Sequence, residues 1–188
     1  MLEFEKKILL TKEEYLILQK HLYGENTGQQ QINYYYDTDD LSMDRQGITC
    51  RIREKNGRFI ATQKVHDEKC NVEKSTVVKG VSELFPLSTI LLKLKGSLMT
   101  KRHKWYQQNG ITVFLDENNY LGVVDYELEI EYPEDKETCA YQEILRIAEM
   151  LYGYGLLHSV YEIAIRLTYA RNKSQRFFDR YQRLCCEN

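Results

Sequence analysis

Charged and apolar side chains alternate along the first ten residues of the chain. Between residues 2 and 8, Glu3, Glu5 and Lys7 occupy every second position, with Leu2, Phe4 and Ile8 among the residues between them. Successive side chains of a β-strand point to opposite faces, so this segment would present one charged row and one largely apolar row. We therefore expect a strand that has a separate environment on each face.

The same alternation returns later in the chain with different charges. Arg51 and Arg53 flank Ile52, and residues 125–131 contain Glu127, Glu129 and Glu131 at alternate positions. A solvated sheet face could explain any one of these strands. Across the chain, however, carboxylates gather on the first and the late strands and cations on the middle ones, whereas ordinary surfaces mix the two signs. The charged faces are therefore expected to share a function.

Length and charge set limits on what the chain can be. Its 188 residues fit a single domain spanning residues 1–188, large enough for its own core. The formal net charge is only −2 although 29% of residues are charged, so no overall basic field indicates nucleic-acid binding. Any anion site must be local.

The cysteines and the hydropathy indicate a soluble cytoplasmic protein. Five cysteines without a Cys-x-x-Cys motif fit free thiols in a reducing compartment. We expect no membrane association, because no segment approaches the roughly 18 apolar residues of a membrane span.

Several other residues have plain structural interpretations. The four histidines lack the spacing of zinc ligands and are expected at the surface or in packing. Tyr34, Tyr35 and Tyr36 fit the wall of a sheet, and the aspartates of residues 37–44 fit a solvated turn and not a calcium loop. By alternation alone, Lys93, Lys95 and Asp116 could face either the inside of the fold, with the other charged rows, or the solvent.

Eight segments have the pattern of strands, and a few have that of helices. Thr11 and Glu14 form the sequence of a capping box before a helix at residues 12–22. Asn56-Gly57 and Asn109-Gly110 are typical of tight hairpin turns. Residues 86–94 are expected to be helical or irregular, and residues 140–151 and 174–184 to be helices. The strands are expected at residues 1–10, 31–37, 48–55, 58–65, 71–78, 98–106, 111–115 and 120–132.

This order of elements predicts an α+β fold, an eight-stranded antiparallel β-barrel or tunnel with helices packed at its ends and outside. Eight strands enclose a space just wide enough for one small ligand. Buried like charges are costly unless they are compensated, so a multiply charged anion beside a divalent cation would suit such a lumen. With the charged faces inward, the lumen would collect Glu3, Glu5, Glu73, Glu127, Glu129, Lys7, Arg51, Arg53, Lys64, Arg102 and Lys104.

Charged motifs recur in a fixed order along the chain: Glu3-x-Glu5-x-Lys7, Arg51-Ile52-Arg53, Ala61-Thr62-Gln63-Lys64, Glu73, Lys101-Arg102-His103-Lys104, Leu115-Asp116, Leu121-Gly122 and Tyr126-Glu127-Leu128-Glu129. In this order they resemble the motifs of the CYTH superfamily of triphosphate tunnel metalloenzymes, which includes class IV adenylate cyclases, thiamine triphosphatases and inorganic triphosphatases. The segment at residues 172–177 resembles the terminal lysine motif of the bacterial YjbK-like subgroup. One departure is residues 160–169, which are longer and more apolar than the usual connection in the family.

The resemblance implies roles for these residues. Mg²⁺ or Mn²⁺, which prefer oxygen ligands, would be bound by Glu3, Glu5, Glu127 and Glu129. The residues implied in catalysis are Glu5, Lys7, Arg53 and Glu129. Those implied in substrate binding are Lys7, Arg51, Arg53, Lys64, Glu73, Arg102, Lys104 and Lys173.

The expected activity is metal-dependent hydrolysis of a small triphosphate, with inorganic tripolyphosphate as the first candidate. A class IV-type adenylate cyclase is the main alternative, because both reactions use the same charged groups. A thiamine or nucleoside triphosphatase, or a module that binds polyphosphate without turnover, are the others, although a pure anion binder gains nothing from buried carboxylates. We expect tripolyphosphate, ATP or thiamine triphosphate as the partner, no nucleic acid and no membrane, and a monomer or homodimer.

Overall fold

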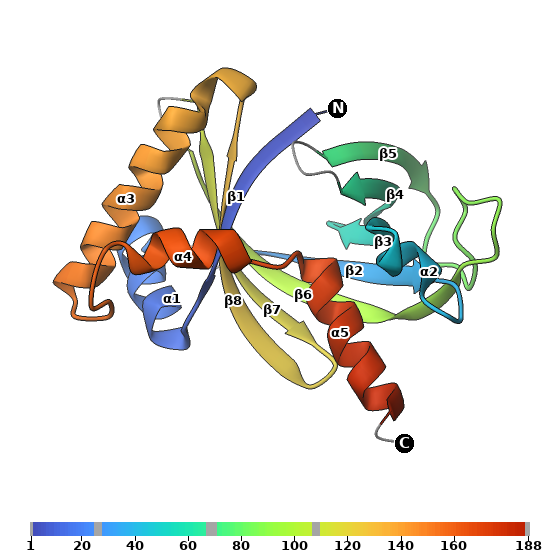
Figure 1. Ribbon diagram of the computed structural model, residues 1–188. Coiled ribbons are helices and arrows are strands. Elements are labelled where there is room, and N and C mark those ends of the chain that lie inside the picture. Colours follow the sequence, from blue (N-terminus) through green and yellow to red (C-terminus); the bar gives the residue numbers. More distant parts are fainter. Residues whose placement is uncertain (1, 25–27, 67–70, 107–109, 187–188) are drawn as a thin grey trace.

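The computed structural model describes residues 2–24, 28–66, 71–106 and 110–186, without the side chains of Leu2, Glu3, Tyr23, Asn71 and Tyr106. Over this part of the chain there are eight strands (Figure 1): β1 (Leu2–Leu10), β2 (Gln29–Asp37), β3 (Ile48–Lys55), β4 (Arg58–His66), β5 (Asn71–Val78), β6 (Lys93–Tyr106), β7 (Thr112–Tyr120) and β8 (Val123–Tyr132). The helical elements are α1 (Lys12–Leu18), the π-helical turn η1 (Gln19–Tyr23), α2 (Ser42–Arg45), the 3₁₀ turn η2 (Glu134–Lys136), α3 (Glu137–Gly153), α4 (Glu162–Tyr169) and α5 (Lys173–Cys186).

The strands form a closed antiparallel barrel in the order β1-β5-β4-β3-β2-β6-β7-β8. The ring is completed where Leu2 of β1 pairs with Val72 of β5. On its other side β1 pairs with β8 from Phe4 to Leu10. This confirms the predicted fold, an antiparallel barrel with helices outside it and at its ends.

Most of the apolar core lies outside the barrel. The outer faces of β1, β7 and β8 pack against α1, α3 and α4 through residues such as Ile8, Leu128 and Ile147. A second cluster covers β3 and β4, where Ile52 packs near Phe85 of the segment between β5 and β6. Burying these side chains removes apolar area from water, the main stabilising contribution to folding. Most lumenal positions are therefore left to polar residues.

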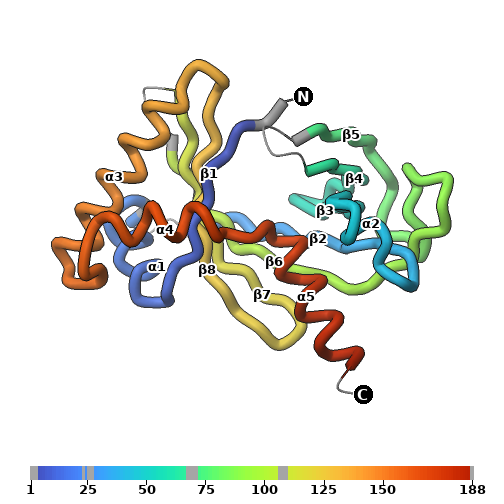
Figure 2. Tube along the Cα trace, viewed as in Figure 1, coloured from blue at the N-terminus to red at the C-terminus, as the bar shows by residue number. Residues whose placement is uncertain are grey.

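The helix α5 contributes a third cluster, at the inner face of β2. Phe177 and Phe178 are buried against Tyr35 of β2, and the ring centroids of Tyr35 and Phe177 lie 4.8 Å apart. In the trace of Figure 2, α4 crosses in front of the barrel and leads directly into α5. The first turn of α5 is thereby fixed at the lumen.

Local sequence signals explain the first helix and the β3–β4 hairpin. The backbone N–H of Glu14 donates to Thr11 Oγ1 at 3.2 Å, and the N–H of Thr11 donates to Glu14 Oε2 at 2.7 Å. This capping box confirms the predicted start of α1. The β3–β4 turn has positive φ at Asn56 (52°) and Gly57 (71°), as the sequence predicts.

The predicted boundaries of the late strands are wrong. We predict a break at residues 116–119, but β7 continues to Tyr120 and the turn lies at Leu121 and Gly122, with φ of 46° and 76°. The polar residues Asp116 and Asn118 belong to the strand because their side chains point inward, where both are buried. β6 begins at Lys93, earlier than predicted.

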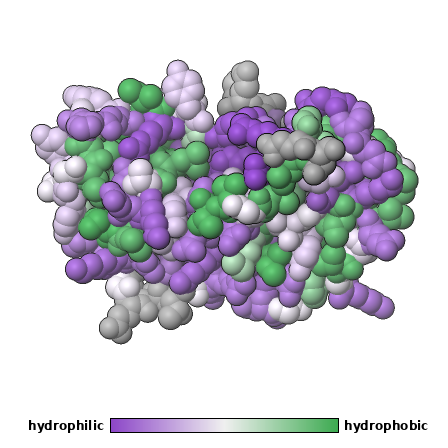
Figure 3. All heavy atoms as spheres, turned by 90° about the horizontal axis from the view of Figure 1, so that it is seen from below, coloured by the Kyte–Doolittle hydropathy of each residue, from purple (hydrophilic) through white to green (hydrophobic). Residues whose placement is uncertain are grey.

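The C-terminal half holds a helix that the sequence analysis does not assign. Residues 160–169 contain α4, and Ile163 on its buried side packs in the cluster against β1 and α3. In the part of the chain that the structure describes, no helix is long and apolar enough to cross a membrane. The face drawn in Figure 3 carries hydrophilic residues between separate hydrophobic patches.

Candidate functional site

The lumen contains a cavity of about 110 Å³ that is lined almost entirely by polar side chains. The lining residues come from β1 to β6, from β8 and from the N-terminus of α5. Nine of them are predicted site residues: Glu5, Lys7, Arg51, Arg53, Lys64, Glu73, Arg102, Glu129 and Lys173. The other seven are Gln31, Tyr35, Thr49, His66, Glu131, Asn172 and Ser174.

The strand period explains which side chains reach the cavity. On β1, Glu5 and Lys7 face the lumen, whereas Lys6 points outward and pairs with Glu137 of α3 at 2.8 Å. On β3, Arg51 and Arg53 line the cavity and the residue between them is buried in an outer cluster. Alternation along each strand thus separates charged lumenal residues from the apolar outer core.

One side of the lumen is an acidic cluster held by cations. Arg102 of β6 forms a two-pronged contact with Asp116, its direct neighbour on β7, at 2.8 and 2.7 Å. The same guanidinium donates to Glu129 at 3.1 Å. Burial alone would raise the pKa of Asp116 and Glu129, but Arg102 and Lys173 hold both pKa values below their ordinary values. Both carboxylates therefore remain ionised.

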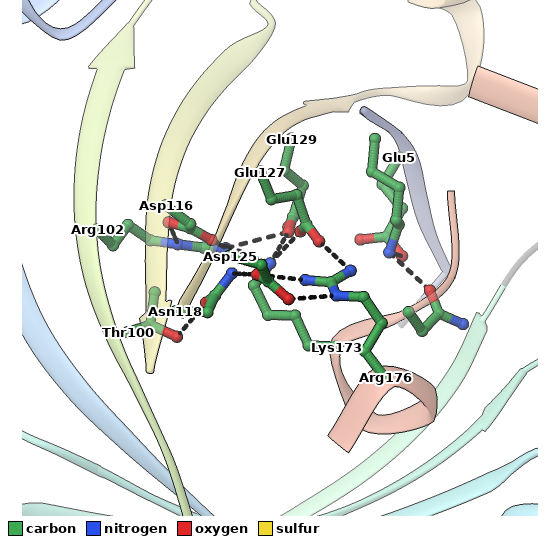
Figure 4. Close-up of polar contacts among 12 residues, drawn as sticks. Glu5, Thr100, Arg102, Asp116, Asn118, Asp125, Glu127, Glu129, Lys173 and Arg176 are labelled. Carbon is green, nitrogen blue, oxygen red and sulfur yellow. Dashed lines mark hydrogen bonds and ion pairs between the residues drawn. The ribbon is translucent and has the colours of Figure 1, made fainter. Parts of the chain in front are cut away.

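The helix α5 supplies two more cations to this cluster (Figure 4). The ammonium of Lys173 lies 3.0 Å from Asp116 and 2.9 Å from Glu129, and it also contacts Glu127. Arg176 donates to Glu127 at 2.7 Å and to Asp125 at 2.9 Å. Burial would lower the pKa of Lys173, but Glu127, Glu129 and Asp116 raise it above its ordinary value, so the ammonium stays charged.

The opposite side of the lumen is cationic. Burial lowers the pKa of Arg53 to about 9, helped by the neighbouring charges of Arg51 and Arg102. Within the described part of the chain, the buried Nε of Arg51, Nδ2 of Asn33 and the hydroxyl of Tyr35 have no hydrogen-bond partner. Buried donors without partners are costly. A ligand with many acceptor oxygens would satisfy them.

A third set of contacts joins β1 to the segment before α5. The ammonium of Lys7 donates to Glu5 at 2.9 Å and to the side-chain oxygen of Asn172 at 2.7 Å. Lys64 lies 3.8 Å from Glu5. Burial and Glu129 act to raise the pKa of Glu5, but Lys7 and Lys64 outweigh them and the pKa is lowered.

The carboxylates form a donor set that fits a hard divalent cation. Among the described residues, Asp116, Glu127 and Glu129 each present an oxygen within 4.8 Å of the others. Glu5 and Glu129 line the cavity itself. Carboxylate oxygens are the ligands that Mg²⁺ and Mn²⁺ prefer. The side chain of Glu3 lies outside the described part of the structure.

Two predicted site residues lie away from the cavity surface. Lys104 is exposed and is not among the described lining residues; its ammonium lies 5.6 Å from the centre of the Phe114 ring. Glu127 is fully buried behind the cavity wall, where it binds Lys173 and Arg176.

The sequence analysis misses several residues of the site. Asp116 is left open there, although its position opposite Arg102 on the neighbouring strand makes it lumenal. His66 is interpreted as a surface or packing residue but lines the cavity, as does Asn172. Alternation counted forward from Lys64 on β4 would have placed His66 on the inner face.

The chain is similar in sequence to a known protein family and to a bacterial protein. The model of the CYTH domain family matches residues 1–157. The protein named "Putative triphosphatase YjbK" from Bacillus subtilis (strain 168) is 32% identical over 147 residues, covering 69% of this chain and 77% of that protein.

Solved structures extend the likeness to nearly the whole chain. A "putative adenylate cyclase" from Bacillus halodurans is 30% identical, with a TM-score of 0.71, covering 94% of this chain and 97% of that one. The Hippeastrum protein HpAC1, described as a putative adenylyl cyclase with a dominant triphosphatase activity, has a TM-score of 0.61 at 17% identity and shares the fold.

Proposed function

Because the chain belongs to the CYTH domain family, we propose that it hydrolyses a small triphosphate inside the barrel, with inorganic tripolyphosphate as the preferred substrate and Mg²⁺ or Mn²⁺ as the cofactor. The observation that carries the proposal is the division of one lumen into a cationic side and an acidic side. A polyanion and a divalent cation match these two sides. The name of the Bacillus subtilis relative supports the same activity.

The cationic side would bind the phosphate chain. Arginine forks bind phosphate oxygens in pairs and lysine adds a compact charge. Arg51, Arg53 and Lys64 face the cavity from the adjacent strands β3 and β4. The Arg51 Nε and Tyr35 hydroxyl donors without described partners would bond to phosphate oxygens as well.

The lining favours tripolyphosphate over a nucleotide. Nucleobases bind well where an exposed aromatic ring allows stacking. Tyr35 is the aromatic residue among the described lining residues, and it is fully buried, with its ring packed against Phe177. Among the described lining residues, a nucleobase would find no exposed face of a tyrosine, phenylalanine or tryptophan ring, which favours hydrolysis of tripolyphosphate over cyclisation of ATP.

Glu5 and Glu129 would hold the metal at the cavity, with Glu127 and Glu3 as the further carboxylates that the family resemblance implies. A divalent ion at such a site neutralises phosphate charge and supplies an activated water. Because their pKa values are lowered, both glutamates are ionised at neutral pH and can bind a cation.

The protein's own part in the reaction is to orient the groups and to stabilise charge. The oxygen of water attacks the terminal phosphorus, the bond to the bridging oxygen breaks, and pyrophosphate leaves. Arg51 and Arg53 would hold the negative charge that develops on the departing oxygens. Arg102 keeps Asp116 and Glu129 in place through the contacts described above.

A substrate panel tests the proposal. Purified protein is incubated with tripolyphosphate, ATP or thiamine triphosphate and with Mg²⁺ or Mn²⁺, and both phosphate and cyclic AMP are measured. We expect phosphate release to be fastest from tripolyphosphate. Formation of cyclic AMP with inert tripolyphosphate would favour the cyclase, and tight binding of tripolyphosphate without turnover would favour the binding module.

A further inference from the structure

His66, the last residue of β4, connects three parts of the molecule at the cavity. Its backbone N–H donates to the carbonyl of Gly47 at 2.9 Å. Its ring Nε2 lies 2.9 Å from Thr49 Oγ1 on β3, and its ring Nδ1 lies 3.2 Å from the side-chain nitrogen of Asn172 before α5. Both ring nitrogens therefore have protein partners.

The direction of each hydrogen bond in this chain follows from the one before it. The ammonium of Lys7 can only donate, so the oxygen of the Asn172 amide must face it, at 2.7 Å. The Asn172 nitrogen then faces His66 and donates to Nδ1. A neutral ring that accepts at Nδ1 carries its hydrogen on Nε2, which donates to Thr49. The Thr49 hydroxyl in turn donates to Ser174 at 2.8 Å.

We propose that His66 is a positioning residue, which fixes the amide of Asn172 and through it the ammonium of Lys7. Lys7 has three donors, and Glu5 and Asn172 direct two of them. Because the ammonium is tetrahedral, these two bonds set the direction of the third donor at the cavity. The inference rests on the proposed function, in which Lys7 binds a phosphate oxygen.

The same contacts argue against a direct role for His66 in binding the phosphate. Its two nitrogens are already bonded to Asn172 and Thr49. It acts on the substrate only through its neighbours.

Replacement by residues of different bonding capacity tests the proposal. Glutamine offers one acceptor and one donor, as the neutral ring does, whereas leucine offers neither. We expect His66→Leu to raise the KM for tripolyphosphate by about threefold to tenfold, the effect of losing one neutral hydrogen bond, with kcat changed less than about twofold. His66→Gln should recover most of the loss. His158→Leu, at an exposed histidine, is the matched control and should change neither constant.

A double-mutant comparison with Asn172 distinguishes a positioning role of His66 from a contribution to packing alone. Because His66 acts through Asn172, His66→Leu should have less than about a twofold effect when Asn172→Ala is already present. Independent, multiplying effects of the two substitutions would overturn the proposal. Equal KM values for His66→Leu and the wild type would also overturn it.

The tautomer of His66 gives a readout that does not depend on turnover. Long-range ¹H–¹⁵N correlation spectra distinguish the two neutral forms of histidine, and His66→Gln identifies the signal. We expect hydrogen on Nε2 in the wild type at neutral pH. Hydrogen on Nδ1 would overturn the positioning role, whereas a wild type that neither binds nor hydrolyses tripolyphosphate would overturn the proposed function itself.

Discussion

The guanidinium of Arg53 is buried beside two other arginines, which makes its positive charge unfavourable. Burial, Arg51 and Arg102 lower its pKa to about 9, and its Nε donates to the neutral oxygen of Asn33 at 3.0 Å. A bound polyanion would compensate this charge. The arginine is therefore costly to the empty protein and useful once an anionic ligand is present.

The first prediction concerns this side chain. We expect Arg53→Ala to lower kcat/KM for tripolyphosphate by about tenfold to a hundredfold, since a charge-assisted contact contributes about 1.5–3 kcal/mol. Arg53→Lys should recover only part of the activity, because lysine keeps the positive charge but lacks the paired N–H donors of the guanidinium. Phosphate release measures both variants, and wild-type activity in Arg53→Ala would contradict the lumenal role of this residue.

The second prediction is a pH dependence of stability that originates at Glu129. Lys173 and Arg102 hold its pKa in the folded protein well below the ordinary value of 4.5, so its stabilising contribution is complete above about pH 4.5 and is lost as the pH falls toward the folded-state pKa. In Glu129→Gln this contribution is absent at every pH. Urea unfolding between about pH 3 and about pH 7 should therefore show a flatter profile for Glu129→Gln.

Glu137→Gln is the matched control for that measurement, because Glu137 is exposed outside the barrel. It should retain both the wild-type profile and the activity, whereas Glu129→Gln should abolish turnover. If Glu129→Gln loses stability in acid as steeply as the wild type, the carboxylate is not held by the lumenal cations.

At the scale of elements, α5 both closes the core and completes the lumenal charge. Phe177 and Phe178 pack against Tyr35 at the inner face of β2, and Lys173 and Arg176 enter the acidic cluster. In that cluster three cations, Arg102, Lys173 and Arg176, face four carboxylates, those of Asp116, Asp125, Glu127 and Glu129. Three positive and four negative charges give this cluster a net charge of −1.

The third prediction follows from this balance. Lys173→Met should destabilise the metal-free protein by about 3 kcal/mol, because it leaves buried carboxylates without their ammonium. The cluster would then carry a net charge of −2, which a divalent cation matches, so Mn²⁺ should bind about tenfold more tightly. Thermal unfolding and calorimetric titration with Mn²⁺ measure the two effects.

Arg183→Met is the control for this experiment, because Arg183 is exposed on the same helix. It should change neither stability nor Mn²⁺ affinity. Unchanged Mn²⁺ affinity in Lys173→Met would show that the ammonium does not stand in for a cation at the three carboxylates.

Local periodicity predicts the elements well and fails where partners lie far apart in the sequence. The inward rows of β1 and β3 follow from alternation alone. The run Asp116 to Asn119 has the composition of a turn, and only its neighbours reveal a strand: Asn118 accepts from Thr100 of β6 at 2.8 Å. The sequence pattern does not predict α4, because the apolar residues of 160–169 do not show which element they cover.

The site follows the same rule. Glu5, Lys7 and the arginines of β3 are found from their own strands, but Asn172 reaches His66 across 106 residues, a separation that no local pattern spans. Lys104 lies two residues after Arg102 on β6, so its side chain is on the same face of the strand, but it is exposed. Alternation predicts on which face of a strand a side chain lies, but not how far along the barrel axis it lies.

For the whole molecule, the fourth prediction separates the metal from the fold. The apolar clusters that stabilise the barrel contain none of the proposed metal ligands. Excess chelator should therefore abolish phosphate release while leaving the circular dichroism spectrum unchanged, and Mg²⁺ or Mn²⁺ should restore activity. Full activity in chelator would contradict the assigned metal dependence.

The position of the two larger apolar clusters on the outer faces of the strands has a consequence for how such a protein can diverge. Mutations of an ordinary enzyme core often change folding and catalysis together, whereas here most of the residues that secure the architecture and most of those that face a ligand occupy opposite sides of the same strands. Selection could replace a lumenal side chain while the outer packing, which supplies the margin of stability, stays intact. One scaffold is thereby free to acquire new reactions by changing every second residue of its strands.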